Sequence, residues 1–339
     1  MSRMTISMRL RQRCWVGESG AMEGAVYVRH VVPEACPACG GPLAAWRSAP
    51  AAEPPHAPVA LWRCPVCGSA VTAAPASSTS HETGAYAPGP PRGARLAAPL
   101  LAAFDRQRLA LLQRATRPPG RLLDAGAGRG RFVAAARAAG WESEGLEPSA
   151  RGVAAARATY GVTLTQAGIG DAAVAPASLD AVTLWHVLEH VEDPAAAIAR
   201  VREWLRPGGV LLLGAPNLAS LQATLAGPRW YHLDLPRHRT HFTATGLRTL
   251  LVASGLRPLS IHHVLLEHNP FGLWQSLVSR VTPTPSWLYL ALKRAAPMRA
   301  VDLVPTLLAL PLAPVAALVE LAAGVARRGG TVAVLARKT

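Results

Sequence analysis

Short runs rich in apolar residues alternate with helical segments between residues 121 and 214. The runs predict strands at 121–124, 142–146, 162–165, 181–185 and 210–214. Apolar residues at helical spacing predict helices near 132–139, 150–158 and 195–205. Asp193-Pro194 is a suitable cap for the last helix, and Pro207-Gly208-Gly209 is expected to end it. Such alternation is typical of an α/β fold in which helices cover both faces of a parallel sheet.

Similar patterns continue on both sides of this region. We expect a helix at 99–115, a helix at 243–254 and a strand at 256–266. The run TVAVLA at 331–336 fits a last strand, so residues 267–330 form an apolar helical insertion ahead of it.

The insertion has no charged residue over the 17 positions 303–319. A bilayer-spanning helix needs about 20 apolar residues, and Pro305, Pro311 and Pro314 are expected to interrupt this one, so we do not expect a span. Two alternatives stay open. The insertion lies in a membrane interface, anchored by its Trp, Tyr, Lys and Arg residues, or it packs as a helical cap on the domain or in a dimer.

The stretch LLDAGAGRGRF, residues 122–132, predicts a buried strand, a tight glycine turn and the start of a helix. Glycines allow a sharp turn and let a ligand approach the amides at the helix N-terminus. Glu147 follows the second strand, 21 positions after Gly126, where such folds place a carboxylate that binds two ribose hydroxyls. Asp124 would repel a pyrophosphate, so we expect a cationic amino-acid nucleoside instead of a dinucleotide.

These residues resemble the first two motifs of Rossmann-like, class I S-adenosylmethionine-dependent methyltransferases of the small-molecule type. The resemblance implies a seven-stranded doubly wound sheet and S-adenosylmethionine as cofactor. Asp124 and the turn would hold the methionine end, Glu147 the ribose, and the turn at 168–171 the adenine. The implied cofactor-binding residues are Asp124, Ala125, Gly126, Gly128, Gly130, Glu147, Pro148, Ile169 and His186.

Two C-P-x-C-G knuckles precede this fold, with Cys36 and Cys39 in the first and Cys64 and Cys67 in the second. Each knuckle offers two thiolates from a tight turn, and the pair completes a tetrahedral site for Zn²⁺. Four thiolates leave no open coordination position, so we expect a structural zinc ion. Disulfide bonds are the alternative, which the absence of an export signal in this sequence disfavours.

His186, Glu189 and His190 match H-x-x-E-H, a zinc-peptidase pattern. The pentad directly follows a strand, and Asp193-Pro194 begins a new helix three residues later, which leaves only about one turn. The stretch LDAVTLWHVLEHVEDP instead resembles the fourth-strand motif of small-molecule methyltransferases, whose following loop flanks the cofactor. It lacks the Asn/Asp-Pro-Pro-aromatic turn with which enzymes that methylate exocyclic amines hold a flipped base.

A long connection at 216–241 contains RWYHLDLPRHRTHF, and loops of this length are often functional. It resembles the segment that covers the acceptor side in the same family. His238 is the candidate catalytic base, with Tyr231 as a second group able to take a proton. The alternative is that these side chains hydrogen-bond the loop in place.

The net charge of +15 suggests anionic partners, but nearly all of the 35 basic residues are arginines scattered along an alanine-rich chain. We expect methyl transfer to a small-molecule, sugar or lipid-linked acceptor. An RNA methyltransferase and a non-catalytic cofactor-binding scaffold are the alternatives. A cytoplasmic location is expected, with membrane contact through 267–330 left open.

The predicted organisation has five parts. Residues 1–30 are expected to be disordered, 31–72 to form a zinc-ribbon-like domain and 73–97 a linker. Residues 98–266 and 331–339 form the methyltransferase domain, which residues 267–330 interrupt.

Overall fold

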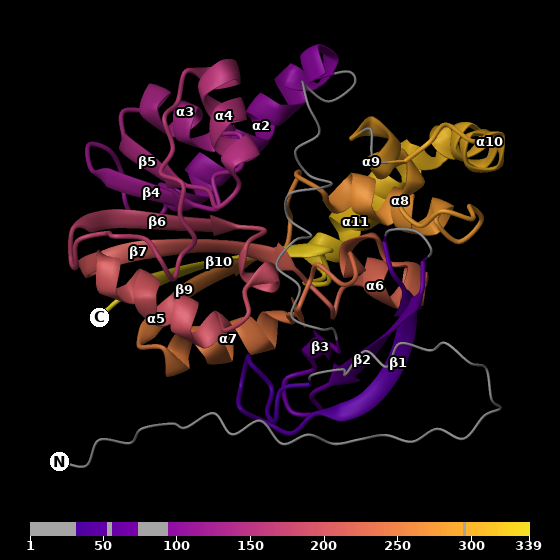
Figure 1. Ribbon diagram of the computed structural model, residues 1–339, viewed down its shortest axis with the longest axis horizontal. Helices are drawn as coiled ribbons and strands as arrows, with labels where there is room; N and C mark the ends of the chain where they lie inside the picture. The colour runs from indigo at the N-terminus through magenta and orange to yellow at the C-terminus, as the bar shows by residue number, and fades with distance from the viewer. Residues whose placement is uncertain (1–31, 53–55, 74–93, 294–295) are drawn as a thin grey trace.

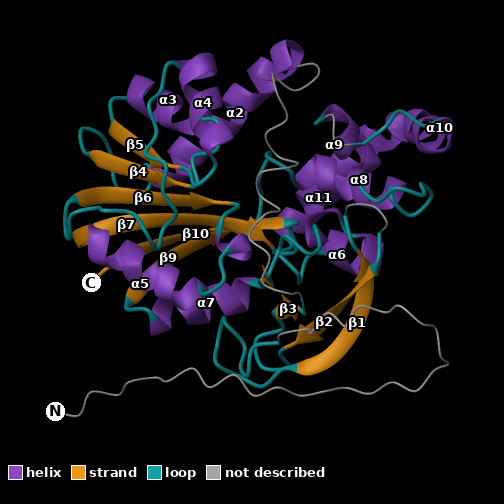
Figure 2. Ribbon diagram, in the orientation of Figure 1, coloured by secondary structure: helices purple, strands orange, loops and turns teal. Residues whose placement is uncertain are grey.

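The main sheet has six strands in the order β5-β4-β6-β7-β10-β9 (Figures 1 and 2). This computed structural model describes residues 32–52, 56–73, 94–293 and 296–339. The predicted segment 1–30 and most of the predicted linker lie outside these residues. The strands are β4 (Arg121–Ala125), β5 (Glu142–Leu146), β6 (Leu179–Trp185), β7 (Leu205–Pro216), β9 (Leu256–His262) and β10 (Thr331–Lys338). The first four are mutually parallel, and β10 is antiparallel to both of its neighbours.

The Rossmann-like α/β fold is confirmed, although one predicted strand is reduced to a single bridge. Residues 162–165 form a single parallel backbone bridge with the edge of β5, between Thr165 and Leu146, and the Leu164 side chain packs near Gly145. Val162 and Leu164 are buried beside the helices that cover this edge, so the segment packs where the seventh strand is expected. Because its backbone pairs with β5 at one residue only, the segment does not form a seventh strand.

Helices cover both faces of the sheet (Figure 1). The helices α2 (Ala94–Leu112), α3 (Arg131–Ala138) and α4 (Ala150–Tyr160) lie on one side, and α5 (Pro194–Trp204) and α7 (Ala244–Ala253) on the other. Successive residues of a strand point to opposite faces. Accordingly, Leu122 packs in a core with α2 and α3, whereas Leu123 packs in a core with α5 and α7. Helix α5 ends at Trp204, before Pro207-Gly208-Gly209, which lies within β7.

A second, four-stranded sheet joins the cysteine knuckles to the methyltransferase fold. Its order is β1 (Ala44–Pro50), β2 (Pro58–Arg63), β3 (Ala70–Thr72) and β8 (Thr240–His241). Strand β8 belongs to the long connection after β7, and it pairs Thr240 with Val71 and His241 with Ala70. The hydroxyl of Thr243, which caps α7, donates to the Cys67 carbonyl at 2.6 Å. The knuckles therefore pack directly against the methyltransferase core.

The insertion forms helices beyond one end of the main sheet (Figure 1). They are α8 (Asn269–Val278), α9 (Trp287–Leu292), α10 (Ala300–Ala309) and α11 (Ala313–Val325), and α6 (Leu221–Ala226) packs against α8 and α11. Helices α8 and α11 contact each other through a small apolar cluster that includes Trp274 and Ala316. Most leucine and valine side chains of α10 and α11 are exposed, among them Leu308 at 76% and Leu318 at 68%.

The prolines interrupt the regular α-helix at one place, where the 3-10 turn Leu310–Leu312 joins α10 to α11. A helical segment runs from Ala300 to Val325 with a mean hydropathy of 2.0, and 22% of its most apolar window is buried. Pro311 and Pro314 each stand in a first turn, where proline is tolerated because the missing N–H has no helical partner there. By length and composition alone, the segment is sufficient to cross a membrane.

Candidate active site

A cavity of about 1370 Å³ opens beyond the carboxyl ends of β4, β5 and β6. The glycine turn after β4 and Glu147 after β5 line one part of it. The connection between β7 and β8, together with α9, lines another part. Drug-sized ligands occupy about 300–1,000 Å³. The cavity is therefore large enough for a nucleoside and a second molecule side by side.

The glycine turn is held against the loop that follows β6. Gly126 has φ of 81°, and a side chain there would place its Cβ 2.3 Å from Val187 Cγ2. Gly130 has φ of 74° and begins α3. A residue other than glycine at 126 would therefore displace either the turn or the loop after β6.

Glu147 is fixed by backbone amides beside this turn. Its side chain is buried, with Oε2 accepting from the Gly128 amide at 2.9 Å and Oε1 from the Ser149 amide at 2.9 Å. Each carboxylate oxygen can accept a second hydrogen bond. A Cβ at Gly152 would lie 2.7 Å from Glu147 Cγ, so the start of α4 limits where this carboxylate can lie.

Asp124 has buried partners that the sequence analysis missed. Its Oδ1 accepts from Thr183 Oγ1 at 2.6 Å and from the guanidinium of Arg108, which lies over the Phe132 ring at 3.7 Å. Nearby, Arg131 bridges Asp105 at 2.9 Å and Glu267 at 3.0 Å. Burial raises the pKa of Asp105 to about 6 despite that ion pair.

Arg108 could have been found from the sequence, because a charged residue on the apolar face of the helix before β4 requires a buried partner.

The remaining predicted cofactor residues divide into two groups. Pro148, Ile169 and His186 line the cavity, as do Gly168 and Gly170 of the predicted adenine turn. Ala125 is fully buried within β4 and is not among the residues that line the cavity. Its packing role explains its presence in the strand better than a ligand contact does.

The H-x-x-E-H histidines point to different neighbours. His186 has φ of 54°, and its ring stacks on His232 with centroids 5.9 Å apart and an interplanar angle of 6°. The His190 ring instead meets His238 edge-on at 4.6 Å. Residues 188–190 form a single 3-10 turn, so the two histidines do not share a helical face as the zinc-peptidase pattern requires.

Glu189 is buried beneath this loop, and its Oε1 lies 3.1 Å from His186 Nδ1. Burial alone would raise the pKa of Glu189, but the hydrogen bond from His186 and the charges of neighbouring histidines lower it to about 2. Glu189 is therefore an anion at neutral pH.

Tyr231 and His238 line the part of the cavity formed by the connection between β7 and β8 and by α9. We call this part the acceptor-side wall. Burial and the nearby Tyr289 raise the pKa of Tyr231 well above its usual value, so it keeps its proton at neutral pH. His238 is buried, with Nδ1 2.8 Å from the His232 carbonyl oxygen and Nε2 3.9 Å from Asp234 Oδ2. His238 thus both lines the cavity and holds the loop.

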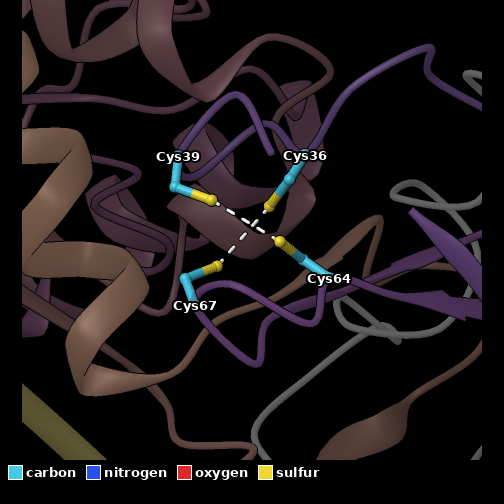
Figure 3. A group of neighbouring side chains, drawn as sticks. All are labelled: Cys36, Cys39, Cys64 and Cys67. Carbon is cyan, nitrogen blue, oxygen red and sulfur yellow. Dashed lines mark hydrogen bonds between the residues drawn. The ribbon is translucent and has the colours of Figure 1, made fainter. Parts of the chain in front are cut away.

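The four predicted cysteine ligands converge at one point (Figure 3). Their sulfur atoms lie within 4.8 Å of one another, with Cys36 and Cys67 Sγ 3.6 Å apart and Cys39 and Cys64 Sγ 3.5 Å apart. No disulfide joins them. Zn–S bonds of about 2.3 Å in a tetrahedron separate sulfur atoms by roughly 3.8 Å, so this arrangement fits a Zn²⁺ ion.

Comparisons with known proteins agree with this fold. The "Methyltransferase domain" family matches residues 97–261. The ubiquinone biosynthesis O-methyltransferase of Cereibacter sphaeroides is 30% identical over 172 residues, which cover 47% of this chain and 68% of that protein. Its counterpart in Xylella fastidiosa is 30% identical over 118 residues, covering 34% of this chain and 47% of that protein. The chain thus spans about half the length of several curated relatives that it matches. It belongs to the methyltransferase domain family.

Solved structures are similar at lower identity. A SAM-dependent methyltransferase from Thermotoga maritima is 18% identical with a TM-score of 0.46, covering 73% of this chain and 93% of that one. Geranyl diphosphate C-methyltransferase from Streptomyces coelicolor is 16% identical with a TM-score of 0.44, covering 72% and 80%.

A partly buried neutral histidine should make stability fall in mild acid. Burial is the main cause that lowers the pKa of His268 from 6.5 to about 4, so the unfolded chain binds this proton first as the pH falls. The stability from neutral His268 is fully present above about pH 6.5 and is lost towards pH 4. Because the His268 side chain is 35% exposed, solvent screens much of this effect, and we expect His268→Gln to flatten the fall by about 1 kcal/mol. Urea unfolding at pH 8, 6 and 5 checks this, and parallel curves for variant and wild type would contradict it.

Proposed function

We propose that the protein is an S-adenosylmethionine-dependent methyltransferase acting on a small-molecule, sugar or lipid-linked acceptor. One observation carries this proposal. A buried carboxylate, Glu147, is held by two backbone amides beside a glycine turn, at the wall of a cavity large enough for two ligands. Family membership supports the same reaction class.

The charged groups and the volume of the cavity support this choice of cofactor. We assign the ribose hydroxyls to Glu147, the methionine end to Asp124 and the turn Gly126–Gly130, and the adenine to the wall at Ile169. Asp124 already pairs with Arg108, so an amino-acid zwitterion would meet a carboxylate and a guanidinium together. Pro148 and His186 would complete the pocket.

The reaction asks mainly for positioning. The sulfonium supplies an activated methyl group, and in-line displacement is favoured by holding the two reactants at the correct distance and angle. The loop after β6 is suited to this role, because Val187 packs on the glycine turn while His186 contacts His232 and His268 on the acceptor side. His238 belongs to that acceptor-side wall.

We further propose that the cysteine cluster binds a structural zinc ion. The four sulfur atoms have the separation and the donor chemistry of a closed ZnS₄ site. The knuckles would then hold β3 in place as a partner for β8 and the acceptor-side loop.

A lipid-linked acceptor is the class that the surface favours. Helices α10 and α11 expose most of their leucine and valine side chains, and the exposed arginines Arg299 and Arg327 flank these helices in the sequence. This pairing of apolar and basic groups is typical of a helix that lies on an anionic membrane. The cavity extends to α9 and Lys293 of the same insertion, so an acceptor could enter from that side. We therefore propose a cytoplasmic enzyme that contacts the membrane.

Cofactor binding tests the central assignment. We expect Gly152→Ala to weaken binding of S-adenosylmethionine and S-adenosylhomocysteine at least about tenfold, because the added methyl group displaces Glu147. Ala154→Leu, on the exposed side of the same helix, should bind as wild type does. Isothermal titration calorimetry gives both values. Failure of folded wild-type protein to bind either compound, or unchanged binding by Gly152→Ala and Glu147→Ala, would refute the assignment.

Vesicle flotation tests the membrane contact. We expect wild-type protein to float with anionic vesicles. In the double variant Leu308→Ser with Leu318→Ser, the partition coefficient into vesicles should fall at least about ten-fold, because each leucine buried in the membrane contributes roughly 1.5–3 kcal/mol. The matched control is Val66→Ser with Val252→Ser, two exposed valines outside the insertion. With labelled methyl donor, label should enter the lipid fraction of a cell extract. Equal flotation of both double variants, or label only in RNA, would contradict this acceptor class.

A further inference from the structure

Three buried or half-buried side chains of the acceptor-side wall form a second candidate metal centre. Potential ligand atoms of Glu189, His190 and His238 all lie within 4.8 Å of one another. Glu189 and His190 come from the loop after β6, and His238 comes from the connection before β8. The Arg239 amide donates to the Glu189 carbonyl at 2.7 Å, so the backbone itself ties these two loops together.

The two histidine rings are oriented by backbone carbonyl groups. His190 Nδ1 lies 3.2 Å from the Arg237 oxygen, and His238 Nδ1 lies 2.8 Å from the His232 oxygen. A carbonyl oxygen only accepts hydrogen bonds, so each Nδ1 carries the proton and each Nε2 carries the lone pair. Metal-binding histidines are oriented in this way, with the far nitrogen donating to a carbonyl or carboxylate.

Glu189 supplies an oxygen that has no hydrogen-bond partner among the residues the structure describes. Its side chain is 1% exposed, and while Oε1 pairs with His186, Oε2 is buried and unsatisfied. Buried polar atoms without a partner are rare, because each one costs free energy of desolvation. A cation between Oε2 and the two imidazoles would satisfy it.

We propose that Glu189, His190 and His238 bind one divalent transition-metal ion. Two imidazole nitrogens and one carboxylate oxygen are a donor set used for zinc and for other first-row divalent ions. The site is separate from the four cysteines. His190 and His238 line the cavity, so further coordination positions would face the acceptor. Here His238 is a ligand and not the proton acceptor expected from sequence.

The role of the ion rests on the proposed methyl-transfer function. An acceptor hydroxyl bound to the ion would release its proton to water more readily, because the positive charge stabilises the resulting alkoxide. The oxygen then takes the methyl group, and the sulfonium leaves as a neutral thioether. Asp234 lies 3.9 Å from His238 Nε2, and its carboxylate is paired with Arg237, so the pair brings little net charge to the site.

Titration of zinc-loaded protein with Co²⁺ tests the site without reference to activity. We expect one Co²⁺ per chain to bind, with an absorption spectrum that lacks cobalt–thiolate charge transfer and so excludes exchange into the cysteines. Glu189→Gln and His238→Asn should each weaken binding at least about 10–100-fold. His262→Asn is the matched control, because His262 is a half-buried histidine on β9 that pairs with Ser260.

Thermal unfolding tests Co²⁺ binding even if a substitution destabilises the protein. Co²⁺ should raise the unfolding temperature of wild type and of His262→Asn but not that of Glu189→Gln or His238→Asn. Absence of Co²⁺ binding by the wild type, or equal binding by both ligand variants, would overturn the site. Cobalt binding without S-adenosylmethionine binding would instead count against the proposed function and leave the metal centre standing.

Discussion

The cavity depends on how the connection between β7 and α7 is fastened to the rest of the molecule. Strand β8 pairs with β3, the Thr243 hydroxyl donates to the Cys67 carbonyl, and the Arg239 amide donates to the Glu189 carbonyl. These contacts join three distant parts of the chain at one place. Ordering a loop over the sheet costs conformational entropy, which these contacts offset. The cysteine knuckles therefore support the acceptor-side wall through β3 and Thr243, although they do not line the cavity.

The loop after β6 links the two halves of the cavity. Val187 packs on Gly126 at the cofactor side, and His186 stacks on His232 at the acceptor side. Glu189 belongs to the same loop, and its side chain is buried and negatively charged. Under the proposed assignment, a change in this loop would affect the binding of both ligands, because the same few residues would position them. This arrangement suits a reaction in which geometry contributes most of the rate enhancement.

Local signals in the sequence predicted the strand, the glycine turn and the helix that border the cavity. The spacing of Gly126, Gly128 and Gly130 and the position of Glu147 after the next strand are set by a continuous strand–turn–helix unit. The same holds for the two cysteine knuckles, whose turns are short and self-contained. In these cases the residues that form the feature are close together in the sequence, so their spacing alone predicts their arrangement in space.

Contacts between distant segments could not be predicted in the same way. The sequence does not show that Arg108 reaches Asp124, that Val71 pairs with Thr240, or that Glu189 and His190 lie close to His238. The apolar pattern of α10 and α11 left burial and exposure open, since both produce the same composition. Only the packing of α11 on α8 determines which side chains remain at the surface.

Hydrogen exchange after loss of the cysteine site tests the central claim most directly. Wild-type protein should contain one zinc ion in the cysteine cluster, and Cys64→Ser should lose it. The control Cys14→Ser, at the one cysteine of the sequence outside the two knuckles, should keep it. The account predicts that amides at 238–243 lose protection in Cys64→Ser, whereas amides of β4 and β7 remain protected. Unchanged protection at 238–243 in a zinc-free Cys64→Ser protein would show that the knuckles do not hold the acceptor-side wall.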